Sequence, residues 1–217
     1  MKKTSIFILL LVITTGCINV RTEYPAISYY ELQKQPISLE KIDTVPGALQ
    51  IRQFDVVSEF DTDAILARLG PTEVERYNYH RWITDLSSMV TDYILSRYSR
   101  AGAFTNGIIG ATSMIVPDYI LEGQVLEMIA VNSESEERGA NRVVFILKAN
   151  LIKRRSMEVE RDILLSETYN IEIPRRNNAV ATIAPAFSKA IAQASDRLLV
   201  DIQNAIAKYN RKLSRTR

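Results

Sequence analysis

The chain has 217 residues, of which 47% are hydrophobic and 24% are charged, with 27 basic residues, 25 acidic residues and one histidine. This composition excludes a disordered chain, a collagen-like repeat and a membrane protein with many spans, and the length suits one domain with an ordinary core. The single cysteine excludes a disulfide framework.

The N-terminus has the pattern of a secretory signal peptide. Lys2 and Lys3 precede an apolar run over residues 5–13, which is too short to span a bilayer because a span needs about 20 apolar residues. Gly16 and Cys17 follow and are similar to the lipobox of bacterial lipoproteins, although Thr14 stands where that pattern usually has leucine. We therefore predict a signal peptide over residues 1–16, cleavage after Gly16 and acylation of Cys17. The alternative is an uncleaved anchor with a buried cysteine.

The predicted mature protein is held at a membrane by its first residue. Three acyl chains on Cys17 would anchor it durably, because each buried CH₂ contributes about 0.8 kcal/mol. Residues 17–27 have no periodicity and are expected to form a tether. In lipoproteins of this kind an aspartate after the cysteine retains the protein in the inner membrane. Ile18 stands there instead, so the resemblance implies the outer membrane, with the chain facing the periplasm.

The first part of the predicted domain, residues 28–210, is rich in strand signals. β-Branched and aromatic residues between turn signals predict four strands, over Ser28–Leu32, Ala48–Val57, Asp61–Ala67 and Glu73–Tyr79. Apolar residues then recur every three or four positions from Trp82 to Tyr98, which predicts an amphipathic helix that ends at Gly102. The glycine-containing segment 104–110 is predicted to be a connection.

The second part repeats the change from strands to a helix. Three strands are predicted over Asp118–Val131, Arg142–Lys153 and Ile163–Ile173, joined by charged loops. In the last strand Ile163, Leu165, Tyr169, Ile171 and Ile173 fall on one face. A long helix with Pro185 in its first turn runs to about Tyr209. This order predicts an α+β fold, a single domain after the signal peptide, with a mainly antiparallel or mixed sheet and two long helices packed on one face.

The residues that common enzymes need are missing from the sequence. His80 is the only histidine, it adjoins aromatic residues, and no nucleophile motif accompanies it. A zinc site would need more ligands than one histidine and an acylated cysteine. The segment Gly102–Gly110 follows a helix and lacks the lysine of a phosphate-binding loop. Asp61 and Asp63 are assigned no role. We predict no enzymatic activity, no cofactor and no metal.

Several stretches resemble the ABC-type transport auxiliary lipoproteins, the family of paraquat-inducible protein C. They are Tyr29–Leu32, Ala48–Val57 (ALQIRQFDVV), Arg81–Tyr98, Pro117–Gly123 (PDYILEG) and the alanine-rich stretch APAFSKAIAQAS of the last helix. The resemblance implies a non-catalytic subunit that docks in the periplasm to the substrate-conducting subunit of an intermembrane lipid transport system. The implied partners are an Mce-domain protein, a permease and an ATPase, and the implied cargo is lipid.

Other roles stay open at this level. A homo-oligomer could encircle a conduit for lipid, but a structural lipoprotein of a periplasmic ring, a secretion gate or an outer-membrane assembly complex is an alternative function. Tyr77, Tyr79 and Trp82 could line a partner or lipid surface. Alternatively they pin a strand to a helix in the core, because large aromatic side chains dominate core packing.

The net charge of +2 falls to zero once the predicted signal peptide is removed. Removing residues 1–16 deletes two lysines and no acid, which leaves 25 basic and 25 acidic residues. Five of these basic residues lie in the last ten positions, and no acid lies there. The predicted folded body is therefore acidic, with a basic tail at residues 211–217 expected to be a frayed helix end, and nucleic acid is excluded as a partner.

Overall fold

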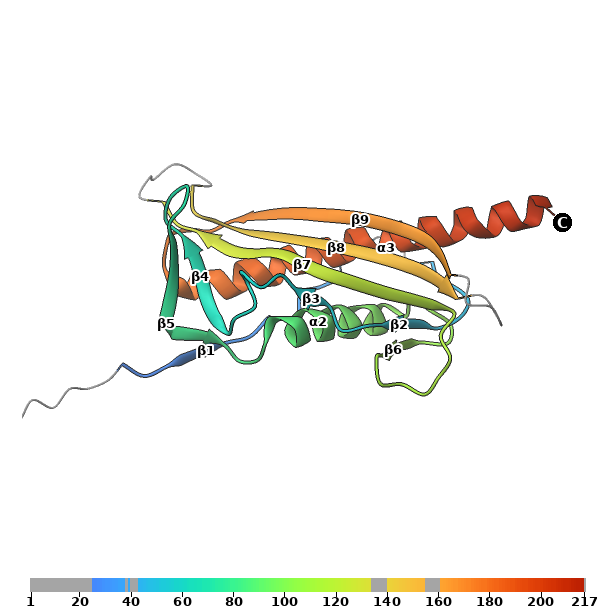
Figure 1. Cartoon of the computed structure of the whole chain (residues 1–217), viewed down its shortest axis with the longest axis horizontal. Helices are drawn as coiled ribbons and strands as arrows, with labels where there is room; N and C mark the ends of the chain where they lie inside the picture. Colours follow the sequence, from blue (N-terminus) through green and yellow to red (C-terminus); the bar gives the residue numbers. More distant parts are fainter. Residues whose placement is uncertain (1–24, 38, 40–42, 134–139, 155–160, 217) are drawn as a thin grey trace, which may run out of the picture.

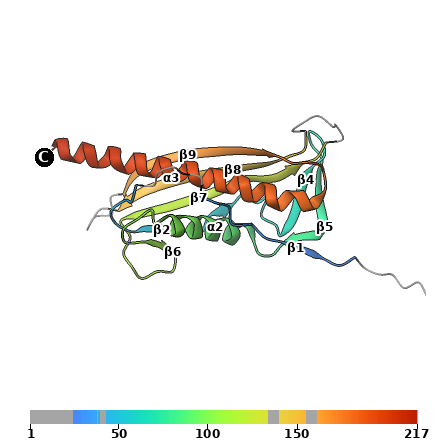
Figure 2. The ribbon, with the colours of Figure 1, turned by 180° about the vertical axis from the view of Figure 1, so that it is seen from behind.

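The computed structural model describes residues 25–37, 39, 43–133, 140–154 and 161–216. They form one α+β domain with a mixed sheet of nine strands, as the sequence predicts. The two long helices, α2 (Leu86–Ala101) and α3 (Ile183–Thr216), lie on the same face of the sheet (Figures 1 and 2). The predicted signal peptide, which ends at Gly16, and most of the predicted tether, which starts at Cys17, lie outside the described residues.

Three long antiparallel strands form the body of the sheet. These are β7 (Tyr119–Val131), β8 (Arg142–Arg154) and β9 (Arg161–Pro174), paired in that order. Alternate residues of β8 point toward the helices and are fully buried: Val143, Phe145, Leu147, Ala149 and Leu151. The opposite face of β9 carries exposed polar residues, so the predicted alternation is confirmed over most of this strand.

Ile163 departs from that alternation. A register shift between Leu151 and Ile152 leaves one extra residue in β9, because Leu151 pairs with Leu165 while Ile152 pairs with Ile163. Such a bulge turns the side chains beyond it to the other face of the sheet. Ile163 is therefore 69% exposed, and its placement on the buried face was wrong.

Three short strands lie end to end along the other edge of β7. They are β2 (Leu49–Ile51), β3 (Asp55–Val56) and β4 (Ala64–Arg68), and all run parallel to β7. The single strand predicted over Ala48–Val57 is thus broken. Outside β2, the short strand β6 (Ile108–Gly110) adds a further edge within the segment that was predicted to be a connection.

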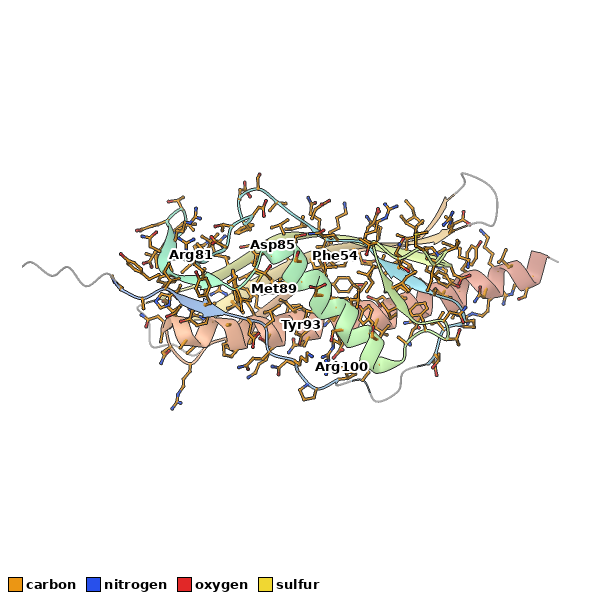
Figure 3. All side chains as sticks on the ribbon, turned by 90° about the horizontal axis from the view of Figure 1, so that it is seen from below. Phe54, Arg81, Asp85, Met89, Tyr93 and Arg100 are labelled. Carbon is orange, nitrogen blue, oxygen red and sulfur yellow. The ribbon has the colours of Figure 1, made fainter. Side chains whose placement is uncertain are left out.

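Phe54 explains the break between β2 and β3. Its backbone N–H donates to Thr91 Oγ1 at 2.9 Å, and Ser87 Oγ donates to its carbonyl. Both backbone groups of Phe54 therefore bond to side chains of α2 instead of to a neighbouring strand. Figure 3 shows Phe54 beside the first turns of α2. The ring is fully buried against Gly123 of β7, where an added Cβ would lie 2.9 Å from Phe54 Cε2. A glycine is needed here because the ring occupies the space of a side chain.

Helix α2 begins four residues later than predicted. Asp85 is its N-cap and accepts a hydrogen bond from the Ser88 backbone N–H at 2.7 Å. Trp82 instead ends β5 (Val74–Trp82), which pairs in parallel with β1 (Ser28–Tyr30). The spacing of Trp82 to the next apolar residues matched a helical stripe, but the capping aspartate sets the start. Gly102, at φ 61°, ends the helix as predicted.

Helix α3 follows a 3₁₀ turn at Val180–Thr182 and runs for 34 residues, about 51 Å. It buries a stripe formed by Phe187, Ile191, Leu198, Ile202 and Ile206. Pro185 lies in its first turn, as predicted. The helix continues to Thr216, so the described part of the basic tail is helical rather than frayed. No glycine or proline interrupts this stretch, and cations near a helix C-terminus are favourable.

Two buried tyrosines tie α3 to its neighbours and make the fold sensitive to alkali. Tyr98 O–H donates to the Ser195 carbonyl and Tyr169 O–H to Asp201 Oδ2, both at 2.8 Å. Burial raises the pKa of both phenols, and Asp201 raises that of Tyr169 further. Because the folded pKa exceeds the unfolded value near 10, stability is complete below about pH 10 and falls above it, by about 1.4 kcal/mol per pH unit for each phenol.

We therefore expect the melting temperature to fall steeply from pH 10 to pH 11.5, and Tyr98→Phe to make that fall shallower. Thermal denaturation followed by circular dichroism across this range measures the slope. Tyr29→Phe is the control, since the Tyr29 side chain is 61% exposed. Equal slopes for Tyr98→Phe and the wild type would contradict the assignment.

Candidate functional site

The aromatic residues singled out from the sequence divide into different environments. Trp82 is 3% exposed, and its ring meets Phe187 of α3 edge to face with centroids 5.8 Å apart. It therefore pins β5 to α3, which was the alternative to a surface role, and it does not reach a surface. Tyr79 is 42% exposed. Tyr77 is half-buried and its hydroxyl accepts a hydrogen bond from Asn132 Nδ2 at 2.9 Å.

Tyr77 belongs to a polar cluster at the end of the long strands. Arg175, which is 6% exposed, donates to the Asn132 side chain, to the Val131 carbonyl at 3.1 Å and to Thr182 Oγ1 at 3.1 Å. Burial lowers the pKa of Arg175, and the nearby Tyr77 partly opposes that shift. Backbone and side-chain oxygens satisfy the guanidinium, so the cluster holds strand ends together.

His80 is part of the packing around these tyrosines. Its Nδ1 lies 3.0 Å from the Tyr30 hydroxyl, and its ring meets that of Tyr77 edge to face at 5.9 Å. Among residues 25–37, 39, 43–133, 140–154 and 161–216, no group of three histidine, cysteine, aspartate or glutamate side chains could hold a metal ion.

An exposed aromatic and aliphatic surface lies beside the start of the described chain. Ile27 and Tyr29, at β1, are 45% and 61% exposed, and Tyr79 lies on the paired strand β5. Figure 1 places β1 and β5 at the left end of the molecule and the C-terminus at the right end. We call Ile27, Tyr29 and Tyr79 the tether-side surface. The predicted tether therefore leads into an end of the domain that exposes apolar side chains.

The N-terminal segment is fixed to both helices immediately after β1. Gln33 N–H donates to Ser188 Oγ of α3 at 2.9 Å, and Gln35 N–H donates to the Tyr93 hydroxyl of α2 at 3.3 Å. Arg97 of α2 donates to the carbonyls of Gln35 and Pro36 at 3.0 and 2.8 Å. Tyr93 faces this segment from the middle of α2 in Figure 3. Both helices thus hold the segment that joins β1 to the rest of the domain.

Arg97 also joins the two helices directly. Its Nε and Nη2 donate to Asp196 Oδ1 and Oδ2 of α3, both at 2.7 Å, and only 1% of its side chain is exposed. Burial opposes the charge of Arg97, but the hydrogen bond and charge of Asp196 outweigh it and raise the pKa of the guanidinium. The ion pair therefore links α2 to α3 inside the fold.

The opposite end of the molecule carries an apolar loop that the sequence analysis missed. Met114, Ile115 and Val116, between β6 and β7, are 98%, 57% and 69% exposed. We call these three residues the apolar loop; it projects below β6 at the right of Figure 1. Three successive apolar residues between Gly110 and Pro117 were the available signal. A cluster of exposed apolar residues is a common mark of an interaction site.

A groove lies at the same end, between the start of β9 and the last turns of α3. It measures about 550 Å³ and is lined by Ile163, Leu164, Ala205, Lys208, Tyr209, Arg211, Lys212 and Arg215. Tyr209 O–H donates to Asp162 Oδ2 at 3.1 Å, which holds α3 over β9. We call it the basic groove. In the part of the chain that the structure describes, no helix is long and apolar enough to cross a membrane.

Comparison with known proteins identifies the family. Residues 30–199 match the family described as ABC-type transport auxiliary lipoprotein component. A crystal structure of a Xanthomonas campestris protein from the DUF330 family superposes with a TM-score of 0.73 at 17% identity, over 85% of this chain and 99% of that one. An uncharacterized protein superposes with a TM-score of 0.61 at 14% identity, over 82% and 99% of the two chains.

These two structures show that the fold is shared. No curated protein sequence matches the chain. The family match covers most of the chain, from the last residue of β1 to about the middle of α3, and it includes α2 and strands β2 to β9. The chain therefore belongs to the ABC-type transport auxiliary lipoprotein family.

Proposed function

We propose that this protein is a non-catalytic subunit of an ABC-type system that moves lipid between the two membranes, anchored in the outer membrane through acylated Cys17. The observation that carries the proposal is the match of residues 30–199 to a family described as an auxiliary lipoprotein component of ABC-type transport. The proposed partners are an Mce-domain subunit, a permease and an ATPase, and a homo-oligomer around the conduit is compatible with this role.

The structure supports an orientation for this subunit. The tether leads to the end with the tether-side surface, where aromatic and aliphatic side chains are exposed. Tyrosine suits the boundary between membrane and water because its ring is apolar and its hydroxyl is polar. We place this end against the outer membrane. The apolar loop, at the other end, then faces the periplasm and contacts the Mce-domain subunit.

Site-specific photo-crosslinking in cells tests the proposal. A photoreactive residue at Ile115 should capture the Mce-domain subunit, because the Ile115 side chain is 57% exposed in the apolar loop. The control is Glu172, an exposed residue on the outer face of β9. A third probe at Tyr79 tests the opposite orientation. Capture at Tyr79 alone would reverse the orientation, and recovery of pilus, secretion-gate or barrel-assembly proteins would replace the proposed function by its rival.

The anchor is tested on the same strains by labelling with a fatty-acid analogue and separating the membranes. Label and outer-membrane location are expected for the wild type and should be lost in Cys17→Ala, because the thiol is the predicted acyl acceptor. Persistence of label in Cys17→Ala would refute acylation at this residue. Capture at Ile115 should also fall in Cys17→Ala if the anchor positions the domain.

A further inference from the structure

The last turns of α3 change character where the sheet ends. From Phe187 to Ile206 the face that packs on β8 and β9 is apolar and at most 2% exposed at each of the five stripe positions. Further along the helix come Lys208, Arg211, Lys212 and Arg215, and these line the basic groove. Spacings of three and four residues keep such side chains together on a helix surface.

The floor of the basic groove is apolar. Ile163 is 69% exposed because the bulge in β9 turns it out of the core, and Leu164 and Ala205 line the groove beside it. Within the described residues, no carboxylate lies within ion-pair distance of Lys208, Arg211 or Arg215. The groove thus places cations around apolar side chains, which is the complement of an anionic headgroup joined to hydrocarbon.

We propose that the basic groove binds an anionic phospholipid, with the phosphate against Lys208, Arg211 and Arg215 and the first acyl carbons on Ile163 and Leu164. A volume of about 550 Å³ holds a headgroup and the adjoining carbons rather than two whole chains. The proposal rests on the proposed function in one respect, because lipid is the cargo of that function, and it names the site where the cargo meets this subunit.

The location of the groove agrees with such a handover. The start of β9 and the last turns of α3, which line it, lie at the end of the domain that carries the apolar loop, away from β1 (Figures 1 and 2). A lipid delivered there by the conducting subunit would meet the basic groove before it reached the membrane that holds the tether.

Lipid retention by the purified full-length lipoprotein tests the inference. The protein, in a non-ionic detergent at low salt, is mixed with phosphatidylglycerol or with phosphatidylethanolamine of the same chains, and bound lipid is counted by native mass spectrometry. We expect phosphatidylglycerol to be retained preferentially. Arg211→Gln with Arg215→Gln should weaken that retention about 30-fold, from about 1 kcal/mol for each cation at an anionic lipid surface.

The matched control is Lys189→Gln with Arg197→Gln, which removes the same charge from exposed positions earlier in the same helix. This variant should bind as the wild type does. A second variant, Ile163→Ser, removes apolar floor without changing charge and should weaken retention several-fold. Circular dichroism melting should give the same transition for all these exposed substitutions.

Several results would overturn the inference. Equal losses in the two double variants, no loss in Arg211→Gln with Arg215→Gln, or equal retention of the two lipids would each do so. Binding of glycerol 3-phosphate as tight as that of the lipid would make the groove a phosphate site. If Arg211→Gln with Arg215→Gln lost photo-capture at Ile115 but retained lipid as the wild type does, the groove would be assigned to a protein partner. Failure to capture the Mce-domain subunit at both Ile115 and Tyr79 in the wild type would refute the proposed function and leave lipid retention unaffected.

Discussion

Replacing Arg97 with methionine is expected to lower the free energy of unfolding by about 3–5 kcal/mol. The substitution leaves Asp196, whose carboxylate is 14% exposed, without its cation, and it removes the donors to the Gln35 and Pro36 carbonyls. A charge left alone in a buried place costs far more than the pair contributed. Urea denaturation of the wild type and the variant measures the difference.

The same substitution should release the N-terminal segment. Limited proteolysis is expected to cut within residues 31–37 of Arg97→Met and to spare the wild type. Arg100→Met is the control, because Arg100 is exposed on the same helix, less than one turn further on (Figure 3), and a surface change of this kind alters stability by about 0.5 kcal/mol or less. Equal stability of Arg97→Met and Arg100→Met would show that the buried ion pair does not join the helices.

Replacing Trp82 with alanine is expected to lower the free energy of unfolding by about 3–5 kcal/mol. The indole is 3% exposed and packs edge to face on Phe187, so its removal leaves a cavity between β5 and α3. A shift of the urea midpoint with an unchanged slope would measure this loss.

Tyr79→Ala is the matched comparison three residues earlier on β5. Its ring is 42% exposed, so we expect a change of about 0.5 kcal/mol or less. The pair of substitutions separates a core aromatic from a surface aromatic on one strand. If Trp82→Ala left the urea midpoint unchanged but abolished capture of a partner, the packing role of Trp82 would be wrong.

Long elements with strong periodicity were predictable from the sequence. The strands β7 and β8 and most of α3 follow the predicted ranges closely, because each buries one face and alternates or repeats apolar residues along its length. The short strands β2, β3 and β6 were not separated correctly. The break between β2 and β3 depends on partners of Phe54 such as Thr91 and Gly123, which are 37 and 69 residues away in the chain.

The candidate site shows the same division. The prediction of Cys17 as the acyl acceptor and the family resemblance come from local sequence, and Cys17 lies outside the described residues. The apolar loop and the basic groove come from tertiary structure. Ile163 looked like a core residue until the bulge at Leu151 and Ile152 was seen to turn it outward, and a bulge leaves no signature in alternation alone.

The sequence by itself determined the fold class, the order of the main strands and helices, and the family. Charge counting already separated an acidic body from a basic C-terminus. Only the tertiary structure decided that Trp82 is buried and that the basic C-terminus continues α3 beside an exposed apolar floor. The physical reason is that periodicity reports which face of one element avoids water, whereas a surface is made by elements distant in sequence, whose contacts and register shifts are set by packing.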